Sequence, residues 1–158
     1  MFTSFKESDK VWIYTSSVEF TEEQINIIDG YATNFLHAWE SHGARVNLTI
    51  KILYKRFIAI AADDCDGSMC GRAQDAQVNL IKQLEQELKI SLLDRMLLAY
   101  RDENKLIRVV SMPEFQKLVE SKSVSDETVV FNNMITLVGE FNKWEVPASE
   151  SWHKQLIS

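Results

Sequence analysis

The stretch from Asp63 to Arg72 concentrates side chains that could take part in chemistry. It holds three carboxylates, two thiols and a hydroxyl within ten residues, and two glycines that permit tight backbone turns. A predicted helix begins just beyond it, and the unbonded N–H groups at a helix start can bind an anion or lower the pKa of a thiol. The stretch therefore predicts a small polar site. Its residues are Asp63, Asp64, Cys65, Asp66, Gly67, Ser68, Met69, Cys70, Gly71 and Arg72.

Metal binding by this stretch is tested by ligand spacing. A calcium loop of the EF-hand type with Gly67 at its sixth position would place Ala62 at the first position and Ala73 at the twelfth. Carboxylates are needed at both positions, so the spacing excludes an EF-hand. A zinc site needs about four ligands, and Cys65 and Cys70 supply two. We predict no bound metal or other cofactor, and these two thiols are the residues to test for one. The other two zinc ligands would have to come from an aspartate or from the histidines, which are His37, His42 and His153.

Nucleophilic catalysis is a second possibility for the same stretch. Cys70 near a helix start could act as a thiolate, with Asp75, Arg72 or His42 assisting. The alternative is a polar loop with incidental cysteines, because a free cysteine is usually a small buried apolar residue. Both interpretations stay open at this point. The residues that could instead bind a ligand are Asp63, Asp64, Gly71, Arg72, Asn132 and Asn133, although the two asparagines could also form a turn.

Several function classes are excluded by missing patterns. None of the five glycines is followed by Lys-Ser or Lys-Thr, and no G-x-G-x-x-G occurs, so the sequence excludes ATP hydrolysis by the P-loop route. Ser149 and Ser151 precede His153 without the G-x-S-x-G pattern of a nucleophile elbow. We expect the three histidines to be structural.

Charge and hydropathy limit the partners and the cellular location that the sequence predicts. Lysine and arginine number 17 and aspartate and glutamate 23, which gives a net charge of −6 and disfavours nucleic acid. The basic residues Lys51, Lys55 and Arg56 surround a predicted turn and are interpreted as a solvated hairpin tip. No apolar run approaches the ~20 residues that cross a bilayer, and the first ten residues lack a signal-peptide core. We therefore expect a cytoplasmic protein with reduced cysteines and no membrane partner.

The N-terminal part predicts alternating strands and helices. Residues 11–14 are rich in β-branched and aromatic side chains, as in a buried strand. Thr21 and Gln24 have the spacing of a capping box at a helix start. Apolar alternation over 46–54 predicts a strand with one solvated face, and the continuous apolar run 57–62 predicts a central strand. A second helix is expected from about residue 73 to residue 89.

The rest of the chain predicts a hairpin followed by mixed elements. Residues 96–100 and 106–110 flank a polar loop, and Ser111 can cap a short helix. The order strand, helix, strand, strand, helix, strand is that of a ferredoxin-like fold, so we expect an α+β protein with an antiparallel βαββαβ core and an extra edge strand. We predict a single domain over 1–158, with a core of about 10–110 and a C-terminal α/β elaboration over 111–158. Further expected elements are a strand at 129–131 and helical residues at 135–141.

Several strings resemble those of a known group of proteins. They are Val11-Trp12-Ile13-Tyr14, Trp39-x-x-His42-Gly43, Tyr54-x-Arg56-Phe57-Ile58, Leu93-Asp94-Arg95-Met96, Val130-Phe131-Asn132-Asn133 and Trp144-Glu145-Val146-Pro147 with Ser151-Trp152-His153. Together they resemble a family of small bacterial proteins that are often described as ABC transporter ATPases and have no established activity. In that family the sequence before the second helix resembles Gly-Cys-Ser-Ile-Asp. Gly71 and Asp75 match it, while Arg72 stands at the cysteine position.

Two functions follow as expectations. The first is a non-enzymatic module that binds a small ligand or a protein and forms a homo-oligomer, because the strand at 46–54 has a polar face and Trp144 and Trp152 lie in a polar tail. The second is a small cysteine-dependent enzyme that uses the 63–75 loop.

Overall fold

The chain folds into helices and antiparallel strands that group into two compact units. The computed structural model describes residues 2–41, 47–63 and 67–157. The first unit comprises Met1–Leu93 with Thr136–Gly139, and the second comprises Asp94–Ile135 with Glu140–Ser158. The α+β class is confirmed. The boundary near residue 93 assigns the hairpin after it to the second unit and not to the predicted core, while a single domain over 1–158 stays a prediction.

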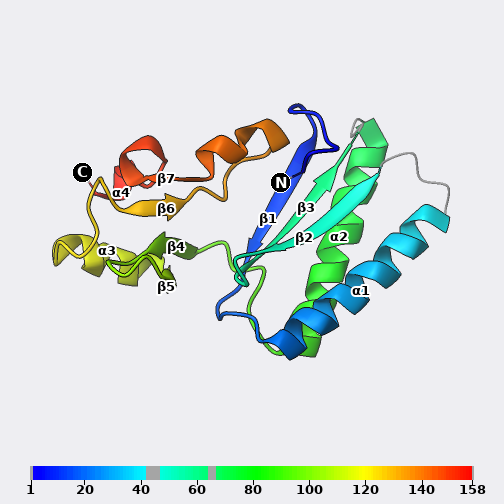
Figure 1. Ribbon diagram of the computed structural model, residues 1–158, viewed down its shortest axis with the longest axis horizontal. Coiled ribbons are helices and arrows are strands. Elements are labelled where there is room, and N and C mark those ends of the chain that lie inside the picture. Colours follow the sequence, from blue (N-terminus) through cyan, green and yellow to red (C-terminus); the bar gives the residue numbers. More distant parts are fainter. Residues whose placement is uncertain (1, 42–46, 64–66, 158) are drawn as a thin grey trace. The chain divides into compact units, whose positions relative to one another are not determined.

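The first unit contains a three-stranded sheet in the order β1-β3-β2 (Figure 1). Both pairs are antiparallel, and every residue of β3 is fully buried, as the continuous apolar run predicted. Two helices cover one face of this sheet, where Ile28, Ile81 and Leu84 pack on Ile58 and Ile60. Its elements are β1 (Lys10–Thr15), α1 (Glu22–Ser41), β2 (Leu48–Leu53), β3 (Phe57–Ala62) and α2 (Gly67–Leu88).

The outer edge of β1 is occupied by a segment far along the chain. The Val11 N–H donates to the Thr136 carbonyl at 2.9 Å, and the Val138 N–H donates to the Asp9 carbonyl at 2.8 Å. Gly139 lies so close to Glu7 that an added Cβ would be 2.7 Å from the Glu7 Cβ, which explains why glycine stands there.

The ferredoxin-like strand order is not confirmed. In that order a fourth strand lies beside β1, but residues 136–138 occupy this edge, and β4 (Leu97–Arg101) pairs with β5 (Ile107–Ser111) and β6 (Val129–Phe131). The local elements were predicted well, whereas the choice of partner for β4 was not, since strand pairing depends on residues distant in sequence.

The two helices of the first unit differ in how well the sequence located them. The capping box of α1 is confirmed, because the Gln24 N–H donates to Thr21 Oγ1 at 3.1 Å and the Thr21 N–H donates to Gln24 Oε1 at 3.0 Å. The second helix begins at Gly67, earlier than the predicted start near residue 73. Ala73 and Gln77 are fully buried, so packing against the sheet holds these early turns in a helix.

The second unit contains a four-stranded sheet in the order β5-β4-β6-β7 and its own core around Phe115. The predicted hairpin is confirmed, and Ser111 caps α3 by accepting the Glu114 N–H. The helix predicted over 135–141 is confirmed in part, since residues 138–141 lie in a 3₁₀ helix whereas residues 135–137 do not. The remaining elements are α3 (Met112–Glu120), η1 (Val138–Lys143), β7 (Glu145–Pro147), η2 (Ala148–Glu150) and α4 (Lys154–Ile157).

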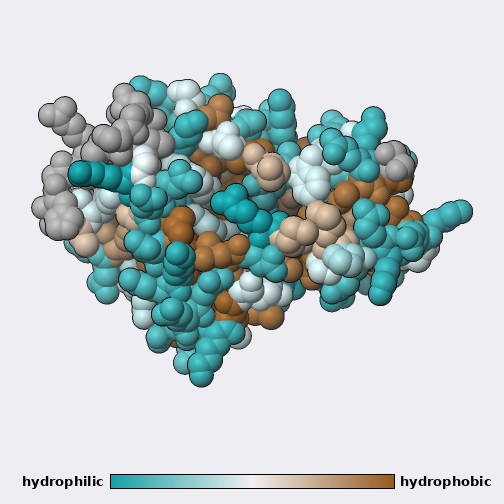
Figure 2. All heavy atoms as spheres, turned by 180° about the vertical axis from the view of Figure 1, so that it is seen from behind, coloured by the Kyte–Doolittle hydropathy of each residue, from teal (hydrophilic) through white to brown (hydrophobic). Residues whose placement is uncertain are grey.

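The face of the molecule seen in Figure 2 is largely polar. Figure 2 shows hydrophilic side chains over most of one face, with apolar residues in small groups. No helix among the described residues is long and apolar enough to cross a membrane. The large apolar side chains that are exposed come from separate segments, and they are Val18, Tyr54, Met96, Leu106 and Met134.

Candidate functional site

Of the predicted polar stretch, the structure describes the side chains of Asp63 and Arg72 and the backbone of Gly71. The Asn47 N–H donates to Asp63 Oδ1 at 2.6 Å, and Asn47 Nδ2 donates to Asp63 Oδ2 at 2.8 Å. Both carboxylate oxygens therefore hold the open end of the β2–β3 hairpin. Asp64, Cys65 and His42 lie outside the described residues, as does the side chain of Cys70, so their predicted catalytic and metal-binding roles stay predictions.

Gly71, Arg72 and Asp75 lie within α2, whereas the sequence predicted Gly71 and Arg72 in the loop before it. All three are exposed, and a Cβ on Gly71 would meet nothing within 4 Å. Glycine disfavours a helix by about 1 kcal/mol. The helix nevertheless includes Gly71, because burial of the neighbouring Ala73 offsets this cost.

The two candidate asparagines of the second unit form part of a turn. Asn132 Oδ1 accepts the Met134 N–H at 3.1 Å, and Asn133 Oδ1 accepts the indole N–H of Trp144 at 2.7 Å. Trp144 is buried, so the hypothesis that it anchors a partner is wrong. These amides stabilise the fold of this unit.

Ser151 and His153 form a pair that resembles a nucleophile and its base. Ser151 Oγ lies 2.8 Å from His153 Nδ1, and the imidazole is fully buried beside the Phe115 ring. Burial lowers the pKa of His153 from 6.5 to about 4, because the charged form loses its hydration. Nε2 is buried with no hydrogen-bond partner in the described structure, so no carboxylate orients this ring. A base this weak and unsupported is typical of core packing rather than catalysis.

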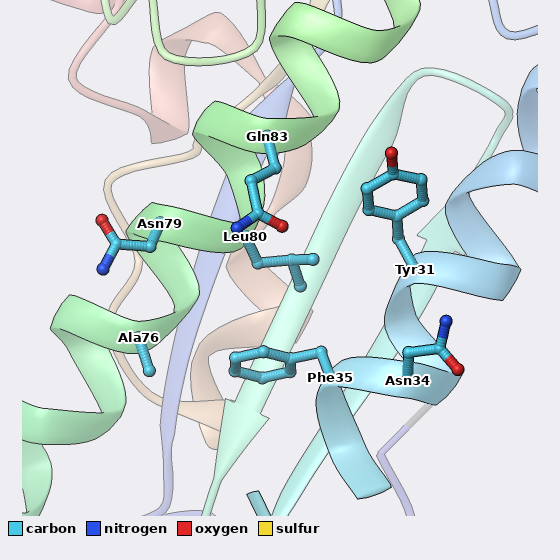
Figure 3. Close-up of a pocket in the computed structure, with 7 residues that line it drawn as sticks. All are labelled: Tyr31, Asn34, Phe35, Ala76, Asn79, Leu80 and Gln83. Carbon is cyan, nitrogen blue, oxygen red and sulfur yellow. The ribbon is translucent and has the colours of Figure 1, made fainter. Parts of the chain in front are cut away.

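A groove between α1 and α2 is the site that the described residues support best. It has a volume of about 480 Å³, which lies within the range of small-molecule sites. Figure 3 shows Tyr31 and Phe35 of α1 and Leu80 and Gln83 of α2 extending toward the space between the helices. The lining residues are Tyr31, Asn34, Phe35, Ala76, Asn79, Leu80 and Gln83.

Helical spacing explains why this groove combines apolar and polar side chains. Tyr31 and Phe35 are four residues apart and so share one face of α1, as Asn79 and Gln83 share one face of α2. Leu80 is buried, whereas the three amide side chains of the groove are exposed. These amides and the Tyr31 hydroxyl make no hydrogen bond to another described residue.

No sequence motif marked the groove, because it depends on how two helices pack. Comparison with protein-family models, with curated proteins and with solved structures finds no match for this chain. Among the described residues, no group of three or more His, Cys, Asp and Glu side chains could hold a metal ion.

Proposed function

We propose that this protein is a non-enzymatic binding module whose α1/α2 groove holds an uncharged small molecule with a flat ring. One observation carries the proposal: four polar side chains without a described protein partner line a groove of about 480 Å³ together with Phe35 and Leu80. An amide offers a donor and an acceptor side by side, which matches the edge of a nucleobase or a peptide group. Tyr31 and Phe35 supply aromatic surface for a ring.

The absence of charge in the lining favours a neutral ligand. None of the seven lining residues carries a formal charge at pH 7, although a quarter of the chain is charged. A phosphate or carboxylate would find no cation in the groove and would be repelled by the net charge of −6. A cationic ligand would find no carboxylate there.

The same lining favours binding over turnover. None of the seven lining residues is a His, Cys, Asp, Glu or Lys, the side chains that most often act as a general base or a nucleophile. Binding with high complementarity needs no such group.

A thermal-shift panel of neutral compounds tests the proposal, with free bases, nucleosides, capped dipeptides and sugars as probes. A ligand at 100 times its dissociation constant adds about 2.7 kcal/mol to the free energy of unfolding. We expect a neutral probe to raise the melting temperature, and its phosphorylated counterpart to raise it less. A panel in which charged compounds alone give shifts would contradict the proposal.

Matched variants locate the binding. Gln83→Ala and Asn34→Ala remove groove amides, while Gln86→Ala and Asn26→Ala remove exposed amides of the same helices outside it. The first pair should weaken binding of a probe about 5- to 10-fold each, since one hydrogen bond contributes roughly 1 kcal/mol. Equal effects of both pairs would show that the probe binds elsewhere.

The finer predictions on origin and location are also proposals. The order strand, helix, strand, strand, helix with both helices on one face supports a relation to ferredoxin-like proteins, and the strings quoted above support membership of the small bacterial family. The net charge of −6 supports a protein that leaves nucleic acid unbound. A cytoplasmic location rests on the sequence patterns alone.

A further inference from the structure

The two edges of the sheet in the first unit differ in whether another described segment bonds to them. The edge of β1 is bonded to residues 136–138. At the other edge, β2 pairs with β3 on one side, and no described strand pairs with it on the other. An unpaired edge presents a row of N–H and carbonyl groups that can bond to another strand.

The register identifies the residues that present these groups. Asn47 and Asp63 bond to each other through their backbones, with the Asp63 N–H donating to the Asn47 carbonyl at 3.1 Å. Bonding alternates along an antiparallel pair, so Thr49, Lys51 and Leu53 bond toward β3. Consequently, the backbone N–H and carbonyl groups of Leu48, Ile50 and Ile52 point away from β3, outward from the edge of the sheet.

The side chains of the same three residues lie on the helix-covered face. Ile50 stands opposite Ile60 and Ile52 opposite Ile58, and both belong to the core of this unit. Their partners on β3 are fully buried, whereas Ile50 and Ile52 are half-buried. The apolar face of the sheet thus continues to its edge.

We propose that a second copy of this chain pairs with β2 in antiparallel fashion, with Ile50 of each copy at the two-fold axis. Leu48 of one copy then stands opposite Ile52 of the other, and Thr49 opposite Lys51. All three outward-pointing residues meet outward-pointing partners, and the two sheets become one of six strands. A two-fold axis across a strand requires this self-complementary arrangement.

Charge selects this register among its neighbours. A slip by one residue would pair the apolar face with the opposite face. A slip by two residues in one direction would place Lys51 opposite Lys51, which is destabilising. A slip by two residues in the other direction would leave Ile52 opposite no residue of the strand Leu48–Leu53. The strand contains no acidic residue, so the shared surface avoids the carboxylates that give each copy its negative charge.

Lys51 is compatible with this contact. A lysine at a sheet edge commonly blocks pairing, but the Lys51 ammonium lies 5.2 Å from the centre of the Phe2 ring of its own unit. The lysine is therefore held over its own sheet rather than pointing along the edge. Because the apolar residues match each other so closely, a second copy is a better occupant than an unrelated peptide.

Sedimentation of the full chain over a wide range of concentration tests the proposal. We expect a species of twice 18.2 kDa that dissociates on dilution. Thr49→Lys places two lysine pairs across the axis, and Thr49→Glu places two Glu–Lys pairs there. Each cross-strand pair contributes roughly 0.2 to 1 kcal/mol and occurs twice, so the dissociation constant should change about 2- to 30-fold, upward for the lysine variant and downward for the glutamate variant.

Charge-matched controls separate this contact from the effect of net charge. Gln86→Lys and Gln86→Glu make the same changes at an exposed position of α2. They should leave the dissociation constant unchanged. A wild-type chain that stays at 18.2 kDa throughout would overturn the proposal. So would Thr49 variants that follow the Gln86 variants, because dimerisation would then use another surface; misfolding cannot imitate opposite shifts of the two Thr49 variants.

Discussion

The amide side chains of the Asn132–Asn133 turn in the second unit and those of the α1/α2 groove in the first unit differ in their hydrogen bonds. In the second unit, Asn132 and Asn133 accept hydrogen bonds at 3.1 and 2.7 Å from the backbone of Met134 and the indole of Trp144. In the first unit, Asn79 and Gln83 of the groove bond to no described residue. An amide that is bonded within the chain stabilises the fold, while an amide without such a bond is available to a ligand. This difference is the reason why the proposed ligand site lies in the first unit.

The largest expected effect tests whether the units are stabilised separately. Leu84→Ala empties part of the core of the first unit, and Phe115→Ala does so in the second. The free energy of unfolding should fall by about 2 to 5 kcal/mol for the first variant and about 3 to 5 kcal/mol for the second. In amide hydrogen exchange, we expect each variant to speed exchange mainly in its own unit. Equal loss of protection in both units would contradict separate stabilisation.

A smaller loss of stability should appear in the second unit when the pH is lowered. The imidazole of His153 titrates near pH 6.5 when unfolded, but its pKa is about 4 in the fold. Between these values the unfolded chain binds the additional proton, so stability is complete above pH 6.5 and falls as the pH drops toward 4. The loss should be on the order of 2 kcal/mol, since one pKa unit corresponds to about 1.4 kcal/mol.

Denaturant unfolding at pH 7.5 and at pH 4.5 measures this loss. His153→Leu replaces the imidazole with an apolar side chain of similar size, which does not titrate, and should remove that part of the pH dependence. If the wild type and this variant lose the same stability on acidification, the buried imidazole is not its cause.

The smallest effect concerns the turn between β2 and β3 in the first unit. Tyr54 and Lys55 have φ values of 53° and 55°, and the Arg56 N–H closes the turn on the Leu53 carbonyl at 3.0 Å. Such a turn favours Asn-Gly. Replacing both residues by Asn-Gly should add about 1 kcal/mol to stability in chemical denaturation, because strain is relieved while the exposed Lys55–Glu22 ion pair contributes little. A loss of stability would show that Tyr54 or Lys55 has a structural role here.

Sequence reasoning succeeded where the determining interactions are local. Thr21 with Gln24 and Ser111 with Glu114 located two helix starts, because each cap bonds within one turn. It failed for β4, whose expected place beside β1 is taken by residues 136–138. Hydrophobic alternation predicts a strand but does not select its neighbour.

The prediction of the candidate site was limited in the same way, because local sequence does not reveal contacts between distant segments. The polar composition of residues 63–72 drew the prediction to that stretch, yet Asp63 serves the hairpin through Asn47. The groove residues Tyr31 and Gln83 belong to different helices and are 52 positions apart in the chain (83 − 31), so no spacing rule joins them. Their proximity is a product of tertiary packing.

The return of residues 136–139 to the first unit has a consequence for synthesis on the ribosome. Residues 1–93 can form their three strands and two helices early, but the edge of β1 stays unbonded until Val138 and Gly139 have left the exit tunnel. During that interval the nascent chain exposes a strand edge to its neighbours on the same messenger RNA. The whole of Asp94–Ile135 must be translated before that edge is closed, so a pause in this stretch would lengthen the period in which the chain can aggregate.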